Sequence, residues 1–163
     1  IALFATSLLF NCSNDDDNQN TGFEGSIQDI RNFYNDDLVD ALEGLGFNIN
    51  TGNAPVDIEG VYFASPMILE ATSVDSDVIG HRFSDYTFTF SNQNNTDLTI
   101  DFNGKQLNTN TEGNGSFISG EGTNFSVFLK TTTVDDSNDT TSDSAIAISG
   151  ELTNDGIKNL QFV

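Results

Sequence analysis

From Ile58 onward the chain consists of short runs in which every second side chain is apolar, and the runs are separated by Asn, Asp and Gly. The clearest run covers residues 83–91, where Tyr86, Phe88 and Phe90 alternate with threonines. A period of two places successive side chains on opposite faces of a β-strand. Asn, Asp and Gly suit tight turns because they tolerate left-handed backbone. This pattern predicts a mainly antiparallel β domain whose sequence neighbours pair in the sheet.

The alternation predicts about seven strands, and the residues between them predict the turns. The strands are expected at 58–65, 83–91, 98–102, 116–119, 125–133, 144–153 and 157–163. Strong hairpin signals are Asn103-Gly104 and Asn154-Asp155-Gly156, and a turn is also expected at 120–124. Residues 134–143 are acidic and predict a long exposed loop. The chain stops within the last predicted strand, so one or two further C-terminal strands are expected.

One segment before these strands has helical rather than strand periodicity. Apolar residues at spacings of three and four form a single stripe over 26–46, which predicts a helix that packs on the sheet. The stripe consists of Ile27, Ile30, Tyr34, Leu38, Leu42 and Leu45. Ser26 is the expected N-cap, and Gly44 and Gly46 end the helix. Asn35-Asp36-Asp37 are poor helix formers, which leaves a break at this point open.

The start of the first strand gives a resemblance. Gly60-Val61-Tyr62 follows the predicted helix, in the place where lipocalins have Gly-x-Trp. In this layout the chain resembles small lipocalin-like lipoproteins of Bacteroidota. The resemblance implies an N-terminal helix followed by an antiparallel meander that closes as an up-and-down β-barrel. A two-sheet β-sandwich is the alternative that the strand pattern leaves open.

The N-terminal residues predict a lipid anchor. Residues 1–10 are almost wholly apolar, which is the length of a signal-peptide h-region and too short to span a bilayer. Cys12 follows, with Leu9 three residues before it, and this resembles the lipobox of bacterial lipoproteins. The resemblance implies that Cys12 is acylated and that 1–11 is the remnant of a signal peptide.

The residues after the cysteine are polar and acidic, with Asp15, Asp16 and Asp17 in a row. Adjacent carboxylates repel one another and stay solvated, so 12–25 is interpreted as a flexible tether and 26–163 as a single domain. The acidic run resembles the export signal of surface lipoproteins in Bacteroidota. It implies an outer-membrane protein that faces the cell surface, and a periplasm-facing protein is the alternative.

Charge and residue counts limit the possible functions. The chain has 25 acidic and 5 basic residues, a net charge of −20, which argues against nucleic acid as a partner. A single cysteine allows no intramolecular disulfide, and a single histidine, His81, makes a zinc site implausible. No catalytic group of residues can be assembled from the sequence. The prediction is therefore a protein that is not an enzyme, with an unidentified hydrolase as the alternative.

The most plausible function is a non-catalytic binding module for a small apolar or glycan ligand. Its candidate ligand-binding residues are the aromatic side chains Tyr62, Tyr86, Phe88, Phe90, Phe117 and Phe128. The alternative is an accessory subunit of an outer-membrane complex that docks through a protein partner. No cofactor is expected, although the hard oxygen ligands Asp135, Asp136, Asp139 and Asp143 form a weak candidate for calcium.

Overall fold

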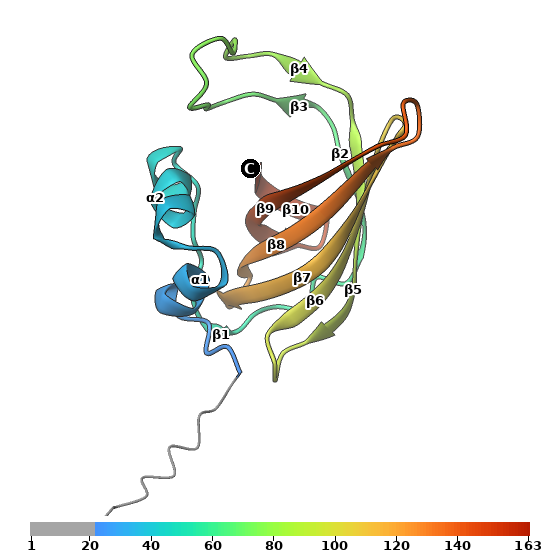
Figure 1. The fold of residues 1–163 in the computed structure, drawn as a ribbon. Helices are drawn as coiled ribbons and strands as arrows, with labels where there is room; N and C mark the ends of the chain where they lie inside the picture. Colours follow the sequence, from blue (N-terminus) through green and yellow to red (C-terminus); the bar gives the residue numbers. More distant parts are fainter. Residues whose placement is uncertain (1–21) are drawn as a thin grey trace, which may run out of the picture.

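The computed structural model describes residues 22–163, which form two short helices and a strongly curved sheet (Figure 1). The helices are α1 (Ile27–Phe33) and α2 (Asp36–Gly44). The strands are β1 (Asn53–Ala54), β2 (Gly60–Ala64), β3 (Met67–Ile68), β4 (Arg82–Phe83), β5 (Tyr86–Asn94), β6 (Thr99–Gln106), β7 (Thr109–Glu121), β8 (Asn124–Asp135), β9 (Thr140–Thr153) and β10 (Gly156–Phe162).

The main sheet is an antiparallel meander in the order β10-β9-β8-β7-β6-β5-β2, with β1 added in parallel to β7. It is nearly closed as a barrel. The predicted fold class, a mainly β lipocalin-like barrel preceded by helix, is therefore confirmed. Seven strands form the path of the sheet, and each of them pairs with its neighbour in antiparallel fashion.

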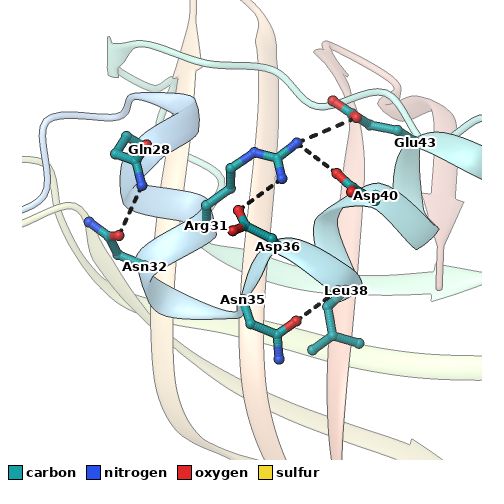
Figure 2. A network of polar contacts seen from close by, with 8 residues as sticks. All are labelled: Gln28, Arg31, Asn32, Asn35, Asp36, Leu38, Asp40 and Glu43. Carbon is teal, nitrogen blue, oxygen red and sulfur yellow. Dashed lines mark hydrogen bonds and ion pairs between the residues drawn. The ribbon is translucent and has the colours of Figure 1, made fainter.

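The predicted helix is divided in two at the point where the sequence left a break open. Tyr34 ends α1, and Asn35 begins α2 by accepting a hydrogen bond from the backbone N–H of Leu38 at 2.8 Å (Figure 2). Ser26 caps α1 as expected, and Asp29 completes a capping box. The Asn35 side chain satisfies a backbone donor that a continuous helix would bond internally.

Arg31 joins the two helices across this break. Its guanidinium contacts Asp36 at 3.0 Å, Asp40 at 2.8 Å and Glu43 at 3.7 Å (Figure 2). The arginine lies on α1 and all three carboxylates lie on α2. This fork of charge-assisted contacts fixes the angle between two helices that are each too short to be stable alone.

One predicted turn is wrong, and one predicted loop is shorter than expected. Asn103-Gly104 lies inside β6, and the turn comes after Gln106. A Cβ atom at Gly104 would lie 1.8 Å from the hydroxyl oxygen of Tyr86, so this glycine makes room for a ring on the neighbouring strand. The expected long loop at 134–143 is also shorter, because β8 continues to Asp135 and β9 begins at Thr140.

A small hairpin that the alternation does not predict lies between β2 and β5. Its strands β3 and β4 pair only with each other, and the segment 66–85 forms an arm that extends from the end of the sheet (Figure 1). Several of its apolar side chains are exposed. These are Ile68, Val74, Val78, Ile79 and Phe83.

Candidate functional site

Four of the six predicted ligand-binding residues lie together inside the barrel. Tyr86, Phe88 and Phe90 are buried on β5, and Tyr62 on β2 packs on Phe88 with ring centroids 5.4 Å apart. Phe102 on β6 continues the same group, 5.7 Å from Phe90. These rings pack on one another, so they fill the interior that a lipocalin-like ligand would occupy.

The other two residues, Phe117 and Phe128, lie on the opposite face of the sheet. They stack on each other at 5.9 Å and pack beneath the helices, where Phe23 and Tyr34 contact them. The register explains this placement, because Leu129 and Val127 face the barrel interior and Phe128 alternates with them. The six residues therefore lie on two different faces of the sheet, and ligand binding by any of them stays a prediction.

The outer face beneath the helices carries a row of buried hydroxyl groups. Ser119, Ser126 and Ser149 are directly opposite one another on β7, β8 and β9, and all three are buried. Two of the hydroxyls bond the loop after α2: Ser126 donates to the carbonyl of Asn48 at 3.1 Å, and Ser119 donates to the carbonyl of Asn50 at 2.6 Å. The Ser149 hydroxyl donates instead to Gln161 at 3.1 Å. Serines on β7 and β8 therefore hold the loop on the sheet.

Gln161 on β10 extends this row by one strand. It lies opposite Ser149, accepts a hydrogen bond from the Asn48 N–H at 2.8 Å and donates to the carbonyl of Gly46 at 3.0 Å. The Asn50 amide donates to the carbonyl of Phe125 at 2.9 Å. The loop 46–50 is consequently hydrogen-bonded to β10 through Gln161 and to β8 through Phe125.

A groove of about 400 Å³ lies between this loop and the ends of β8, β9 and β10. We call it the amide groove, because asparagine side chains contribute most of its polar groups. Its lining residues are Glu43, Phe47, Asn48, Ile49, Asn50, Asn124, Ser149, Gly150, Glu151 and Asn159. Buried Phe47 and half-buried Ile49 supply its apolar part. Within the described residues, the side chains of Asn124, Glu151 and Asn159 have no hydrogen bond.

A β-bulge places one of these groups. The pairing of β10 with β9 shifts between Lys158 and Gln161, and Asn159 within the shift has a φ of +50°. Asparagine tolerates this left-handed backbone better than most residues. Bulges redirect side chains and are common beside functional sites. Asn124 and Glu151, a directly opposed pair on β8 and β9, line the same groove as Asn159.

A second groove of about 520 Å³ lies on the same face beyond the junction of the helices. We call it the lysine groove. Its lining includes Leu38, Asn114, Lys130, Thr132 and Asp143. The Lys130 ammonium lies 4.7 Å from the centre of the Phe33 ring, and Thr132 donates to Asp143 at 2.7 Å, so its main polar groups already have partners.

Tyr34 forms the wall between the lysine groove and the core. Its hydroxyl accepts a hydrogen bond from the Leu129 N–H at 2.9 Å and donates to the carbonyl of Ile146, between β8 and β9. Burial raises the pKa of the Tyr34 hydroxyl far above its usual value, and the hydrogen bonds from the backbone oppose this shift. The group is therefore a neutral structural element at physiological pH.

The acidic residues proposed for calcium are not brought together. Asp135 accepts hydrogen bonds from the backbone and hydroxyl of Ser137, and Asp143 is paired with Thr132 one strand away. Over 22–163 no group of three or more His, Cys, Asp or Glu side chains is arranged to hold a metal ion. Asp143 lies within β9 opposite Thr132, away from the turn that contains Asp136 and Asp139. His81 packs edge-on against Phe83 in the arm.

Cys12 and the carboxylates Asp15, Asp16 and Asp17 lie outside the described residues. Among the helices that the structure describes, none has the length and apolar character needed to cross a membrane. The residues that form the amide groove were not among the sequence candidates. The only sequence signal for a polar site here was serine at positions 119, 126 and 149, which lie within predicted strands where buried apolar side chains would be expected.

Comparisons with known proteins give no match: no family model, no curated protein and no solved structure is similar to the chain.

Proposed function

We propose that this domain is a non-catalytic binding module whose amide groove holds a glycan. The observation that carries the proposal is the convergence of Asn124, Glu151 and Asn159 on one groove with unused hydrogen-bonding groups. An amide offers two donors and an acceptor, and a carboxylate offers acceptors only, so together they match the hydroxyl groups of a sugar. Half-buried Ile49, which lies beside buried Phe47 in the groove lining, offers an apolar surface for the carbon face of a sugar ring.

The charge of the groove narrows the ligand class. Glu43 and Glu151 line it, and none of its lining residues is basic. A uronic or sialic acid would bring a third carboxylate close to these two, at an electrostatic cost. The preferred ligand is therefore a neutral oligosaccharide or one that carries an amino group. The filled barrel interior gives less support to a small apolar ligand.

The test is a screen of the purified domain against an array of neutral, amino and acidic oligosaccharides, followed by calorimetry on the strongest hit. Asn124→Ala and Asn159→Ala should each weaken binding by roughly tenfold, which corresponds to about one hydrogen bond. Asn103→Ala is the matched control, because Asn103 is an exposed strand residue outside the groove. A hit that binds both groove variants and the control equally would contradict the proposal, and so would an array without any hit.

We further propose that the domain is attached to the bacterial outer membrane through acyl chains on Cys12, with Asp15, Asp16 and Asp17 directing it to the cell surface. The resemblance of this segment to a lipobox and to a surface-export signal supports the proposal. A glycan-binding domain on an acidic tether would meet its ligand outside the cell. The variants that test this attachment are described in the Discussion.

A second candidate function is an accessory subunit that docks a protein partner. It is favoured by the exposed apolar side chains of β2 and of the arm. This function does not exclude glycan binding, because the amide groove is formed by α2, β8, β9 and β10.

A further inference from the structure

The chain contains the dipeptide Asn-Gly at two places, 103–104 and 114–115. In this dipeptide the backbone nitrogen of the glycine can attack the side-chain carbonyl carbon of the asparagine, because glycine has no side chain that obstructs the approach. The attack requires rotation of the asparagine backbone away from the extended conformation of a strand. The place of each dipeptide in the sheet therefore decides whether it can react.

The first dipeptide is held inside the sheet. Gly104 lies opposite Phe88 of β5 and Thr111 of β7, so it is paired on both sides. It is also buried, and a Cβ atom at its position would lie 1.8 Å from the Tyr86 hydroxyl oxygen. Asn103 is paired with the same two strands. Rotation of this peptide would disturb the pairing with both strands, so a reaction here depends on local opening of the sheet.

The second dipeptide lies in a β-bulge on β7. The pairing with β8 shifts between Gly113 and Gly115, and Asn114 is the extra residue. A bulge leaves its extra residue unpaired and disrupts the ladder locally. On the other side of β7, the pairing with β6 ends at Glu112, two residues before the exposed Asn114. Rotation of this peptide therefore disturbs fewer contacts than rotation at 103–104.

We propose that Asn114 is a site of covalent self-modification. The Gly115 nitrogen loses its proton and forms a bond to the side-chain carbonyl carbon of Asn114. The bond from this carbon to Nδ2 breaks, and the nitrogen leaves as ammonia. Water then adds to one carbonyl carbon of the cyclic imide and opens the ring, which leaves aspartate or isoaspartate at this position. Water is the only other reactant.

The modification changes the charge of the lysine groove, which Asn114 lines together with Lys130 and Asp143. Among the described residues that line this groove, Lys130 and Asp143 are the charged ones, and their charges are opposite. The Asn114 amide donates to the Thr132 hydroxyl, which itself donates to Asp143 at 2.7 Å. A carboxylate in place of this amide cannot donate to Thr132 and adds a second negative charge beside Lys130. The lysine groove therefore becomes more acidic as the protein ages.

The experiment incubates the folded full chain at neutral pH and follows both dipeptides by peptide mass spectrometry. Replacement of the side-chain NH₂ by OH raises the mass of a peptide, and chromatography separates isoaspartate from aspartate. Asn114 should convert at least about tenfold faster than Asn103, because Asn103 reacts only in locally opened molecules. In urea the two should convert at similar rates, because the fold no longer distinguishes them.

Gly115→Ala tests the attack by the backbone nitrogen. The alanine methyl group obstructs this nitrogen but fits the fold, because a Cβ atom at Gly115 would have no neighbouring atom within 4 Å. The substitution should slow the conversion of Asn114 by about tenfold or more and leave that of Asn103 unchanged. Unfolding of the variant would be detected by circular dichroism, and the ratio of the two rates in the wild type would then decide the question.

Three results would each overturn the proposal. The first is equal conversion of Asn114 and Asn103 in the folded chain. The second is an Asn114 that converts in urea but stays intact in the folded chain, which would mean that the bulge protects it. The third is conversion of Asn114 at the same rate in the folded wild type and in folded Gly115→Ala.

Discussion

The hydroxyl of Tyr34 is expected to be one of the most important single polar groups for stability, because it lies between two central strands. It accepts from the Leu129 N–H at 2.9 Å and donates to the carbonyl of Ile146. Tyr34→Phe keeps the ring on Phe128 but leaves both backbone groups without this partner. Net losses of about 1–2 kcal/mol for each group predict a total of about 2–4 kcal/mol in the free energy of unfolding. For a domain of this size, that lowers the melting temperature by roughly 6–15 °C.

Urea unfolding followed by circular dichroism measures this loss, and Tyr62→Phe is the matched control. The Tyr62 hydroxyl donates to a single carbonyl, that of Ile58, at 2.9 Å, and its side chain is only half-buried. The control should lose about 0.5–1.5 kcal/mol. Equal losses in the two variants would refute the reasoning, because they would mean that the position of the hydroxyl between the strands has no special effect.

Four other predictions follow from the structure and the sequence. Gly104→Ala should destabilise the domain by about 1–3 kcal/mol, because the added Cβ collides with the Tyr86 hydroxyl. The loss should be smaller in a Tyr86→Phe background. Urea unfolding of the wild type, the two single variants and the double variant tests this, and additive losses would contradict it. Burial raises the pKa values of Tyr34 and Tyr86 above the ordinary 10.0. Above pH 10 the unfolded state therefore loses protons that the folded state keeps, and the free energy of unfolding should fall as the pH rises. A melting temperature that is constant from pH 9 to 11 would count against this. Cys12→Ala should move the protein from the membrane to the soluble fraction, and a variant that still sediments with membranes after a salt wash would contradict acylation at Cys12 as the anchor. Replacing Asp15–Asp17 with alanine should leave the protein in the membrane but reduce its digestion by protease added to whole cells, and equal digestion would leave the acidic run as a spacer.

The strands could be predicted from the sequence because alternation is a local property. The run 86–91 has a buried and a more exposed side chain in turn, and it forms most of β5. The run 125–133 alternates in the sequence and also forms a strand, but residues 125–129 are all buried because the helices cover the outer face of the sheet there. Asn103-Gly104 misled the same reasoning. Its glycine is required by Tyr86 on the adjacent strand, a contact between residues 18 positions apart that no local pattern reports.

The amide groove could not be predicted from the sequence, because its residues come from distant parts of the chain. Asn48 follows α2, Asn124 begins β8 and Asn159 lies in β10. Each one alone is an ordinary polar residue in a chain that is rich in asparagine. Only the pairing of β8, β9 and β10 brings them to the same face, and the φ of +50° at Asn159 depends on a bulge that the sequence does not signal.

A second bulge decides which face of the sheet Phe117 occupies. On β7, Gly113 faces the barrel interior, where an added Cβ atom would lie 3.4 Å from the Cβ of Phe102. Strict alternation from Gly113 would place Phe117 on the same face. The register shifts by one residue between Gly113 and Gly115, and this single insertion turns Phe117 to the outer face, where it meets Phe128. The shift therefore adds Phe117 to the outer aromatic group that packs beneath the helices, whereas Phe128 reaches that group by ordinary alternation with Val127 and Leu129 on β8.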